Sequence, residues 1–436
     1  MRVLFVTYDN SGASLCYKLH KEGNDVRLLI FDKNKLTQKA LSGMVKKISD
    51  LKKGLSWVGK NGLVVFDNTG YGKLQNKLRK EGYSVVGGSE LGDKLEDNRQ
   101  YGQKIFSAVG MKIVPSVNFP NLHKTIDFLK KNPGPWVIKQ NGHANKTINY
   151  VGKFKDNRDT ISLLNRYNRS YYTKKNCTHF DLQERIDGVE IGVGRYFNGQ
   201  DWVGPIEINI EYKDFFGNNL GPKTHEMGTL MWYDDNVNNK LFQETLAKLK
   251  SYLQKIDFRG DIDINCIVNK KGAFPLEATA RFGYPAVQLH MEIHKSPWGE
   301  FLKALADGKG YDLKWKKGYG IVVLVATPPF PYHRPQFASF SPEGITIFFK
   351  DSFTQEDLNH IHFEEIAKRK TGEYYICDHT GYVMHVTGMG KTVEEARRNV
   401  YSIINKIVIP KKYYRTDIGE KFIKEDYKKL KRWGYI

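Results

Sequence analysis

Residues 260–283 read GDIDINCIVNKKGAFPLEATARFG, and this stretch carries the strongest signal for both fold and chemistry. Two runs suited to β-strands, 260–268 and 273–278, flank a turn at Lys271-Gly272. Apolar residues alternate with polar ones in the first run, which is the period of a strand with one buried face. The stretch therefore predicts a β-hairpin.

Side chains with oxygen atoms recur along this hairpin at every second position. Asp263 and Asn265 share one face of the first strand, and Glu277 and Thr279 share one face of the second. Pairing the two strands gathers oxygen ligands of the kind that a Mg²⁺ ion bridging nucleotide phosphates requires. Arg281 follows, with a guanidinium suited to an anion such as a carboxyl phosphate. An alternating strand at a protein surface would give the same pattern without a metal.

Upstream of the hairpin, the sequence contains groups that could bind a nucleotide. Lys139 closes an apolar strand, and the polar loop 141–147 after it carries Lys146, so both lysines could reach phosphates. The octet 183–190, QERIDGVE, predicts a strand, a tight turn and a second strand. Such a segment can present backbone groups to an adenine edge while Glu190 accepts ribose hydroxyls. An ordinary hairpin with an Asp-Gly turn is the alternative.

The N-terminal part alternates strands with helices. Strands are expected at 2–7, 25–31, 62–67 and 83–86, with helices between them, which predicts a parallel sheet flanked by helices. A linker is expected at 87–92 and a helix from about 95 to 109; farther on, strands are expected at 180–185 and 189–196 and a helix at 240–256. The dinucleotide fingerprint GxGxxG is absent, which argues against a nicotinamide dehydrogenase. Short strands follow residue 318.

Composition narrows the functional class further. The chain has 436 residues and a formal net charge of +20, from 68 Lys and Arg against 48 Asp and Glu. That charge attracts anions such as nucleotides, phosphorylated metabolites or nucleic acid, although it also serves solubility alone. Four separated cysteines fit neither a disulfide framework nor a zinc ribbon. With no apolar run of membrane-spanning length, we expect a soluble cytoplasmic protein with no membrane partner.

Three motifs, taken in order, carry a resemblance to a known family. The stretches 221–228 (GPKTHEMG), 277–283 (EATARFG) and 413–419 (YYRTDIG) resemble GPNTGGMG, EFNARFG and YRxDIG of the glycinamide ribonucleotide synthetases, or phosphoribosylamine–glycine ligases. These enzymes belong to the ATP-grasp ligases. The resemblance implies an α/β fold with an N-terminal parallel-sheet domain (1–92), an ATP-grasp core (93–316) and a small C-terminal α+β domain (317–436).

The family's reaction implies the cofactors and the site. ATP phosphorylates the carboxylate of glycine, and the amine of phosphoribosylamine attacks the acyl phosphate. The resemblance implies ATP contacts from Lys104, Lys139, Lys146, Glu184, Ile186 and Glu190; Mg²⁺ or Mn²⁺ ligands from Asp263, Asn265, Glu277 and Thr279; substrate contacts from Lys223, Thr224, His225 and Arg281; and catalytic roles for Arg281 and Lys146. The loop at 141–147 is expected to close over ATP.

Departures from the family motifs concern the substrates most. Residues 7–14 read TYDNSGAS where the family has GGGGREHA, and His225 and Glu226 replace two glycines. These changes favour a related ligase with altered substrates, acting as a monomer or homodimer on an amino acid and an amine. A second hypothesis joins the amino acid to a modified nucleotide or nucleobase, possibly in nucleic acid, and is motivated by the positive charge. A third is a nucleotide-binding protein without catalysis, motivated by Thr279 in place of Asn and by a glycine-poor loop at 142–148.

Overall fold

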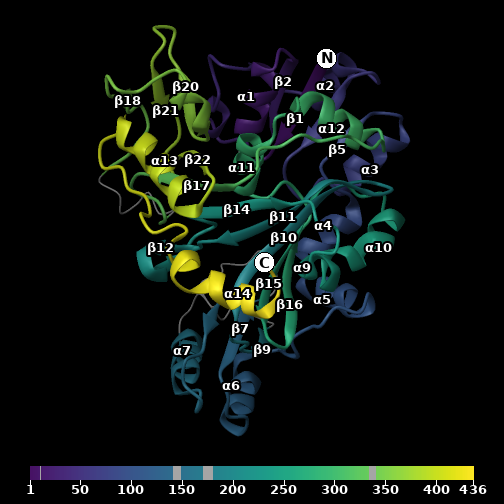
Figure 1. Ribbon diagram of the computed structural model, residues 1–436, viewed down its shortest axis with the longest axis vertical. Helices are drawn as coiled ribbons and strands as arrows, with labels where there is room; N and C mark the ends of the chain where they lie inside the picture. The colour runs from purple at the N-terminus through teal and green to yellow at the C-terminus, as the bar shows by residue number, and fades with distance from the viewer. Residues whose placement is uncertain (10, 141–148, 170–179, 333–339) are drawn as a thin grey trace.

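A computed structural model describes every residue of the chain except 10, 141–148, 170–179 and 333–339 (Figure 1). Within the described residues, the longer strands form a five-stranded, a four-stranded and an eight-stranded sheet. The expected phosphate loop at 141–147, with Lys146, lies outside the described residues. No helix in the described part of the chain combines the length and apolar character needed to cross a membrane.

The N-terminal sheet is parallel, with the order β3-β2-β1-β4-β5. Its elements are β1 (Arg2–Thr7), α1 (Ala13–Lys21), β2 (Asp25–Ile30), β3 (Lys46–Lys47), α2 (Leu51–Val58), β4 (Leu63–Phe66), α3 (Gly72–Lys80) and β5 (Val85–Val86). The central strand β1 is an unbroken apolar run whose side chains from Val3 to Val6 are fully buried, as a parallel strand covered on both faces requires. The predicted parallel sheet is thus confirmed.

Two helices, α4 (Glu90–Asp97) and α5 (Arg99–Ala108), replace the expected linker and single helix. Ser89 begins α4 by accepting a hydrogen bond from the backbone N–H of Gly92, so the linker ends earlier than predicted. Asn98 is extended and its side chain accepts from the N–H of Tyr101 at 2.9 Å. This capping interaction stops one helix and starts the next, which apolar periodicity does not reveal.

The four-stranded sheet has the order β6-β9-β7-β8 and forms a small lobe at the bottom of Figure 1. Its elements are β6 (Ser116–Phe119), α6 (Leu122–Lys131), β7 (Trp136–Gln140), β8 (Tyr150–Val151), α7 (Arg158–Arg169) and β9 (Phe180–Glu184). Both helices pack on the sheet around a separate core that includes Leu129, Ile138, Leu164 and Leu182. The lobe presents Lys139 on β7 next to the larger sheet.

The eight-stranded antiparallel sheet occupies the centre of the molecule, in the order β16-β15-β10-β11-β14-β17-β22-β19 (Figure 1). Its strands are β10 (Val189–Asn198), β11 (Trp202–Glu211), β14 (Gly228–Asp234), β15 (Arg259–Asn269), β16 (Gly272–Thr279), β17 (Tyr319–Ala326), β19 (Ile361–Phe363) and β22 (Tyr382–Gly390). The predicted hairpin is confirmed as β15 and β16. Because β17 pairs with β14, the sheet continues across the predicted boundary at residue 316.

The expected strand pair at 180–196 proves not to be a hairpin. β9 pairs with β6 and β7, whereas β10 pairs with β11 and β15, so the chain passes from one sheet to another between them. A Cβ at Gly188 would lie 2.3 Å from the carbonyl oxygen of Val268 on β15. The glycine of the Asp-Gly pair therefore permits a close approach to another strand.

The remaining helices and three strand pairs complete the fold. They are α9 (Lys240–Glu244), a 3₁₀ turn (Leu246–Leu249) and α10 (Lys250–Lys255), which replace one expected helix; α11 (Ala286–Ile293), α12 (Trp298–Ala306), α13 (Val393–Lys406) and α14 (Tyr427–Trp433); and the strand pairs β12 (Asp214–Phe216) with β13 (Leu220–Lys223), β18 (Phe348–Phe349) with β23 (Ile407–Val408), and β20 (Ile366–Lys368) with β21 (Tyr374–Ile376).

Candidate active site

Two glycines on β10 allow side chains from its neighbouring strands to meet. A Cβ at Gly192 would lie 2.2 Å from Oδ1 of Asn209, and one at Gly194 would lie 2.9 Å from Oε2 of Glu207. Asn209 on β11 therefore reaches across β10 and donates through Nδ2 to Oδ2 of Asp263 on β15, at 3.0 Å. The same amide donates to Oε1 of Glu207 at 2.7 Å. These bonds join the polar rows of β15 and β11.

A group of carboxylates gathers around Lys213, two residues beyond β11. The Nζ atom lies 2.6 Å from Oε2 of Glu211, 3.4 Å from Oε1 of Glu277 and 3.6 Å from Oε1 of Glu190. Asn265 donates through Nδ2 to Glu211 at 2.6 Å and to Glu190 at 3.2 Å. We call Glu190, Glu211, Glu277, Asn265 and Lys213 the carboxylate cluster.

The carboxylate cluster and its surroundings hold more acids than bases. Burial lowers the pKa of Lys213, but the charges of its three carboxylate neighbours outweigh that effect and hold the pKa well above its ordinary value. Burial raises the pKa of Glu211, and burial together with the charges of neighbouring acids raises the pKa values of Asp263 and Glu226 strongly. A further cation would relieve this crowding of negative charge.

The donor atoms of the carboxylate cluster fit a hard divalent cation. Oδ1 of Asn265 is buried and has no hydrogen-bond partner among the described residues, so a neutral oxygen ligand is available. Glu277 and Glu190 are about half exposed and offer carboxylate oxygens. Carboxylate and amide oxygens are the ligands that Mg²⁺ takes in proteins. Thr279, predicted as a ligand, lies opposite Asp263 in the strand register.

Lys139 approaches the carboxylate cluster from the other sheet. Burial, with a further contribution from the charge of Arg99, lowers its pKa to about 8, although Glu277 and Glu190 oppose both effects. Arg99, the first residue of α5, donates to Oε1 of Gln183 on β9 at 2.9 Å. Two cationic side chains thus face the acids of the carboxylate cluster where the two sheets meet. Arg99 was not predicted from the sequence.

The remaining predicted nucleotide contacts lie around this junction. Glu184 ends β9 and is exposed, and Ile186 is half-buried in the segment that leads to β10. Lys104 is exposed on α5, beside Gln103, whose side chain donates to the carbonyl of Leu276 at 3.1 Å. Whether these residues contact a nucleotide stays a prediction.

The predicted substrate residues of the GPKTHEMG motif divide into two groups. Thr224 donates through its backbone N–H and its hydroxyl to the carbonyl of Lys213, at 2.7 and 2.9 Å, and so fixes the cluster lysine. Lys223 is largely exposed and pairs with Asp214 at 2.8 Å, and His225 is exposed. Thr224 is thus bonded directly to the carboxylate cluster.

Arg281 lies toward the N-terminal domain. Its Nε donates to Oε1 of Glu96 on α4 at 3.0 Å, and Glu96 also accepts from the N–H of Ala280 at 2.7 Å. Burial lowers the pKa of Arg281, but the charge and hydrogen bond of Glu96, together with the charges of Asp9 and Asp67, outweigh that effect and raise it. The guanidinium therefore faces the loops that follow β1 and β4.

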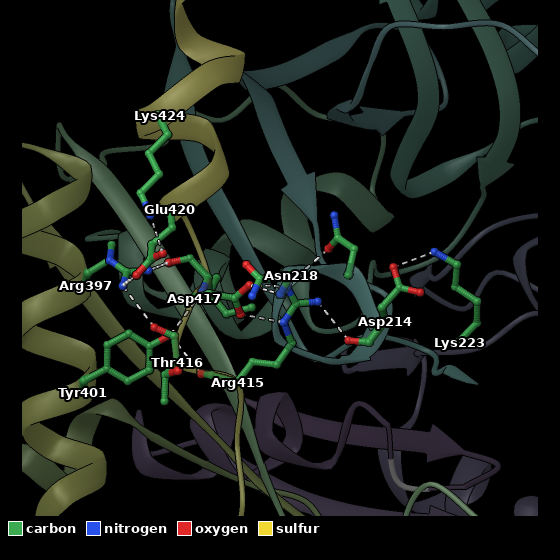
Figure 2. A network of polar contacts seen from close by, with 12 residues as sticks. Asp214, Asn218, Lys223, Arg397, Tyr401, Arg415, Thr416, Asp417, Glu420 and Lys424 are labelled. Carbon is green, nitrogen blue, oxygen red and sulfur yellow. Dashed lines mark hydrogen bonds and ion pairs between the residues drawn. The ribbon is translucent and has the colours of Figure 1, made fainter. Parts of the chain in front are cut away.

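The motif YYRTDIG holds the β12–β13 hairpin in place (Figure 2). Arg415 is buried and forms a two-pronged ion pair with Asp417, at 2.8 and 2.7 Å. It also donates to the carbonyl of Asp214 at 2.9 Å, while Asp417 accepts from the N–H of Asn218 at 2.9 Å (Figure 2). Since the hairpin starts directly after Lys213, this clamp positions the chain that leaves the carboxylate cluster.

One buried group beneath the carboxylate cluster has the composition of a metal site: Glu207, Asp261 and His290. Both ring nitrogens of His290 have partners, because Nε2 lies 2.6 Å from Oε2 of Glu207 and Nδ1 lies 2.6 Å from the hydroxyl of Tyr196. Burial lowers the pKa of His290 by less than Glu207 and Asp261 raise it. Both nitrogens of His290 are thus already engaged by protein groups, which makes the ring a hydrogen-bonding partner of Glu207 and Tyr196.

Sequence reasoning missed the contribution of β11. Glu207, Asn209, Glu211 and Lys213 recur at every second position, as Asp263 and Asn265 do on β15. This alternation was available in the sequence. What it could not supply was the pairing of both strands with the glycine-bearing β10.

Comparison with known proteins locates the chain among its relatives. Residues 338–421 match the family model "Phosphoribosylglycinamide synthetase, C domain". Phosphoribosylamine–glycine ligases of Clostridium acetobutylicum and Streptomyces coelicolor are 25% and 24% identical, each over 80% of this chain and over 81% and 80% of the respective relative.

Similar folds occur among solved structures. The phosphoribosylamine–glycine ligase of Thermotoga maritima superposes with a TM-score of 0.70 at 19% identity, covering 96% of this chain and 100% of that one. A biotin carboxylase of Campylobacter jejuni, solved as a complex with a β,γ-ATP compound, gives 0.65 at 11% identity, covering 99% and 98%. Both likenesses concern the fold.

Proposed function

We propose that this chain is an ATP- and Mg²⁺-dependent ligase that joins a carboxylate to an amine. The proposal is supported by its distant homology to the phosphoribosylamine–glycine ligases, with which it shares the ATP-grasp fold. The carboxylate belongs to an amino acid such as glycine, and the amine is phosphoribosylamine or a related amine. The reaction proceeds through an acyl phosphate. The division of the sequence into 1–92, 93–316 and 317–436 is part of this proposal, with one eight-stranded sheet shared by the last two parts.

The observation that carries the proposal is the opposition of acids and bases where the four-stranded and eight-stranded sheets meet. Glu277 and Asn265 provide metal ligands on one side, and Lys139 and Arg99 provide positive charge on the other. A magnesium nucleotide needs both, since its phosphates are anionic and its metal prefers oxygen. Lys213 keeps the carboxylates close together until the metal joins them.

The proposed chemistry needs little covalent work from the protein. A carboxylate oxygen of the amino acid attacks the γ-phosphorus of ATP, and ADP leaves. The amine nitrogen then attacks the carbonyl carbon, inorganic phosphate leaves, and the new amide nitrogen loses its proton. Mg²⁺ held by Glu277 and Asn265 would shield phosphate charge, and Lys139 would stabilise the transferring phosphoryl group. Glu184, Ile186 and Glu190 would bind the adenosine.

Hydroxylamine trapping tests carboxylate activation without knowledge of the amine. The protein is incubated with Mg²⁺, ATP, hydroxylamine and each amino acid in turn, and hydroxamate and ADP are measured. We expect both products with at least one amino acid, and neither with Glu277→Gln. Glu343→Gln, which changes a partly exposed acid paired with Lys39, is the matched control. ATP binding without amino-acid-dependent ADP release would favour the non-catalytic alternative and contradict our proposal.

An aromatic cavity supports a second candidate, in which the acceptor amine belongs to a nucleobase in nucleic acid. The cavity has a volume of about 870 Å³, within the range of ligand pockets. Its walls include Phe215, Phe216, Phe330, Tyr413, Tyr414 and Lys411. Aromatic rings beside a lysine suit a stacked base next to a phosphate. ADP release that requires an oligonucleotide and falls steeply with salt would favour this candidate.

A further inference from the structure

Two acids occupy the carboxyl edge of the N-terminal sheet, where open α/β sheets bind ligands. Asp67 follows β4 directly and accepts from the N–H of Gly12 at 2.8 Å. Asp9 follows β1 and accepts from the hydroxyl of Ser11 at 2.8 Å and from Nδ2 of Asn68 at 3.0 Å. Asp9 is exposed and Asp67 is buried, so one acid lies at the surface and the other in the interior.

The C-terminal part of the chain brings a third acid to the same place. Gln288 on α11 donates to Oε1 of Glu364 at 2.8 Å and to the hydroxyl of Ser14 at 3.2 Å. Ser14 lies in the first turn of α1, two residues after the glycine that contacts Asp67. Glu364 is buried and also lies 3.2 Å from Nδ1 of His385. We call Asp9, Asp67, Gln288 and Glu364 the acidic junction.

Two buried oxygen atoms in the acidic junction have no partner. Oδ1 of Asp67 and Oε1 of Gln288 are each buried without a hydrogen bond to any described residue. Both atoms are acceptors, and an unpaired buried acceptor is costly. A ligand that supplies N–H or O–H donors would satisfy them.

The acidic junction contains three carboxyl groups, and two of them, Asp67 and Glu364, retain their protons more readily than ordinary acids do. Burial raises the pKa of Asp67 to about 7 and raises that of Glu364 well above its ordinary value, and Asp9 adds to both effects. Burial holds the pKa of His385 well below its ordinary value, which keeps this ring neutral. Arg281 faces the junction but is already paired with Glu96. An ammonium group can displace these protons and pair with the carboxylates, whereas a phosphate dianion would meet three acids and a guanidinium that is already paired.

We propose that the acidic junction binds the acceptor amine and selects an acceptor without a phosphate group. The amine enters as an ammonium ion between Asp9, Asp67 and Glu364, and its donors pair with the open oxygens of Asp67 and Gln288. This inference rests on the proposed function and narrows it, because it excludes phosphoribosylamine as the preferred acceptor.

Matched pairs of amines test the selection. Ribosylamine and 5-phosphoribosylamine are generated from ammonia with ribose or ribose 5-phosphate, and glucosamine is compared with glucosamine 6-phosphate. ADP release is measured with Mg²⁺-ATP and the amino acid that gives hydroxamate, and binding is measured by calorimetry. We expect at least one unphosphorylated member to act or bind at least tenfold better than its partner. Binding should release protons, since a bound cation lowers the pKa of Asp67.

Substitutions in the acidic junction test whether the preference for unphosphorylated amines arises there. Asp67→Asn and Asp9→Asn each remove one charge with little change of volume, and each should reduce the discrimination by at least threefold. Asp25→Asn changes an exposed acid at the opposite edge of the same sheet and should leave it unchanged. Equal use of both members, preference for the phosphorylated one, or no effect of either variant overturns the inference. Hydroxamate formation needs no acceptor, so its survival separates this failure from failure of the proposed function.

Discussion

The glycine at position 192 should be indispensable to the site, and the structure allows the effect of replacing it to be worked out. Gly192→Ala would place a methyl carbon 2.2 Å from Oδ1 of Asn209, where ordinary contact begins at 3.4 Å. Asn209 has to retreat by about 1.2 Å, which stretches its bonds to Glu207 and Asp263 beyond hydrogen-bonding distance. The overpacking costs about 1–3 kcal/mol, and each buried acid left without its donor costs about 1–3 kcal/mol more. We expect a loss of about 3 kcal/mol or more.

Chemical denaturation followed by circular dichroism and tryptophan fluorescence would measure this loss, with hydroxamate formation as the functional readout. Gly310→Ala is the control, because a Cβ there meets nothing within 4 Å and its φ is not in the left-handed region. The control should unfold within about 0.5 kcal/mol of the native protein. If Gly192→Ala matched the control in both stability and hydroxamate rate, the polar rows of β11 and β15 would not depend on close approach across β10.

Three further changes test other parts of the site. Glu277→Gln should abolish hydroxamate formation with an unchanged circular dichroism spectrum, since it removes a ligand charge and little volume; normal turnover would remove Glu277 from the metal site. ATP affinity should fall as the pH rises through about 8, because the depressed pKa of Lys139 means that its charge is present below that pH and lost above it. Lys139→Arg should flatten this profile between pH 7 and 9 in equilibrium binding, and an unchanged profile would argue against the assignment. Asp417→Asn should lower the free energy of unfolding in denaturant by about 3 kcal/mol, because the buried guanidinium of Arg415 would lose the negative charge of its partner. Glu425→Gln, which changes an exposed ion pair, should lower it by less than about 1 kcal/mol.

The sequence predicted local structure well wherever one period dominates. The β15–β16 hairpin was identified because Asp263 and Asn265 alternate with buried apolar residues and a Lys-Gly turn follows. The parallel N-terminal sheet was identified because apolar strands alternate with helices. Both patterns are local: in the hairpin, backbone geometry alone fixes which side chains share a face, and in the N-terminal part a helix precedes each following major strand along the chain.

What escaped prediction depends on contacts between distant segments. Lys213 and Glu211 meet Glu277 only because β10 lies between β11 and β15, and no local pattern encodes that order. The break at Asn98 depends on a side-chain cap that competes with a continuous helix. Arg99, placed by that break, acts on Lys139 from a helix that sequence periodicity had merged with its neighbour.

The continuity of the eight-stranded sheet limits how this protein can evolve. β17 and β22 continue the sheet from β14. The last quarter of the chain therefore contributes strands to the same hydrogen-bonded sheet that positions the carboxylate cluster. A gene shortened at residue 316 would leave β14 with an uncovered row of peptide groups, which invites association between chains. We therefore expect new substrate specificities among relatives of this protein to arise by changes in loops, such as the loop between β1 and α1. Gain or loss of the whole C-terminal segment is not expected to produce them.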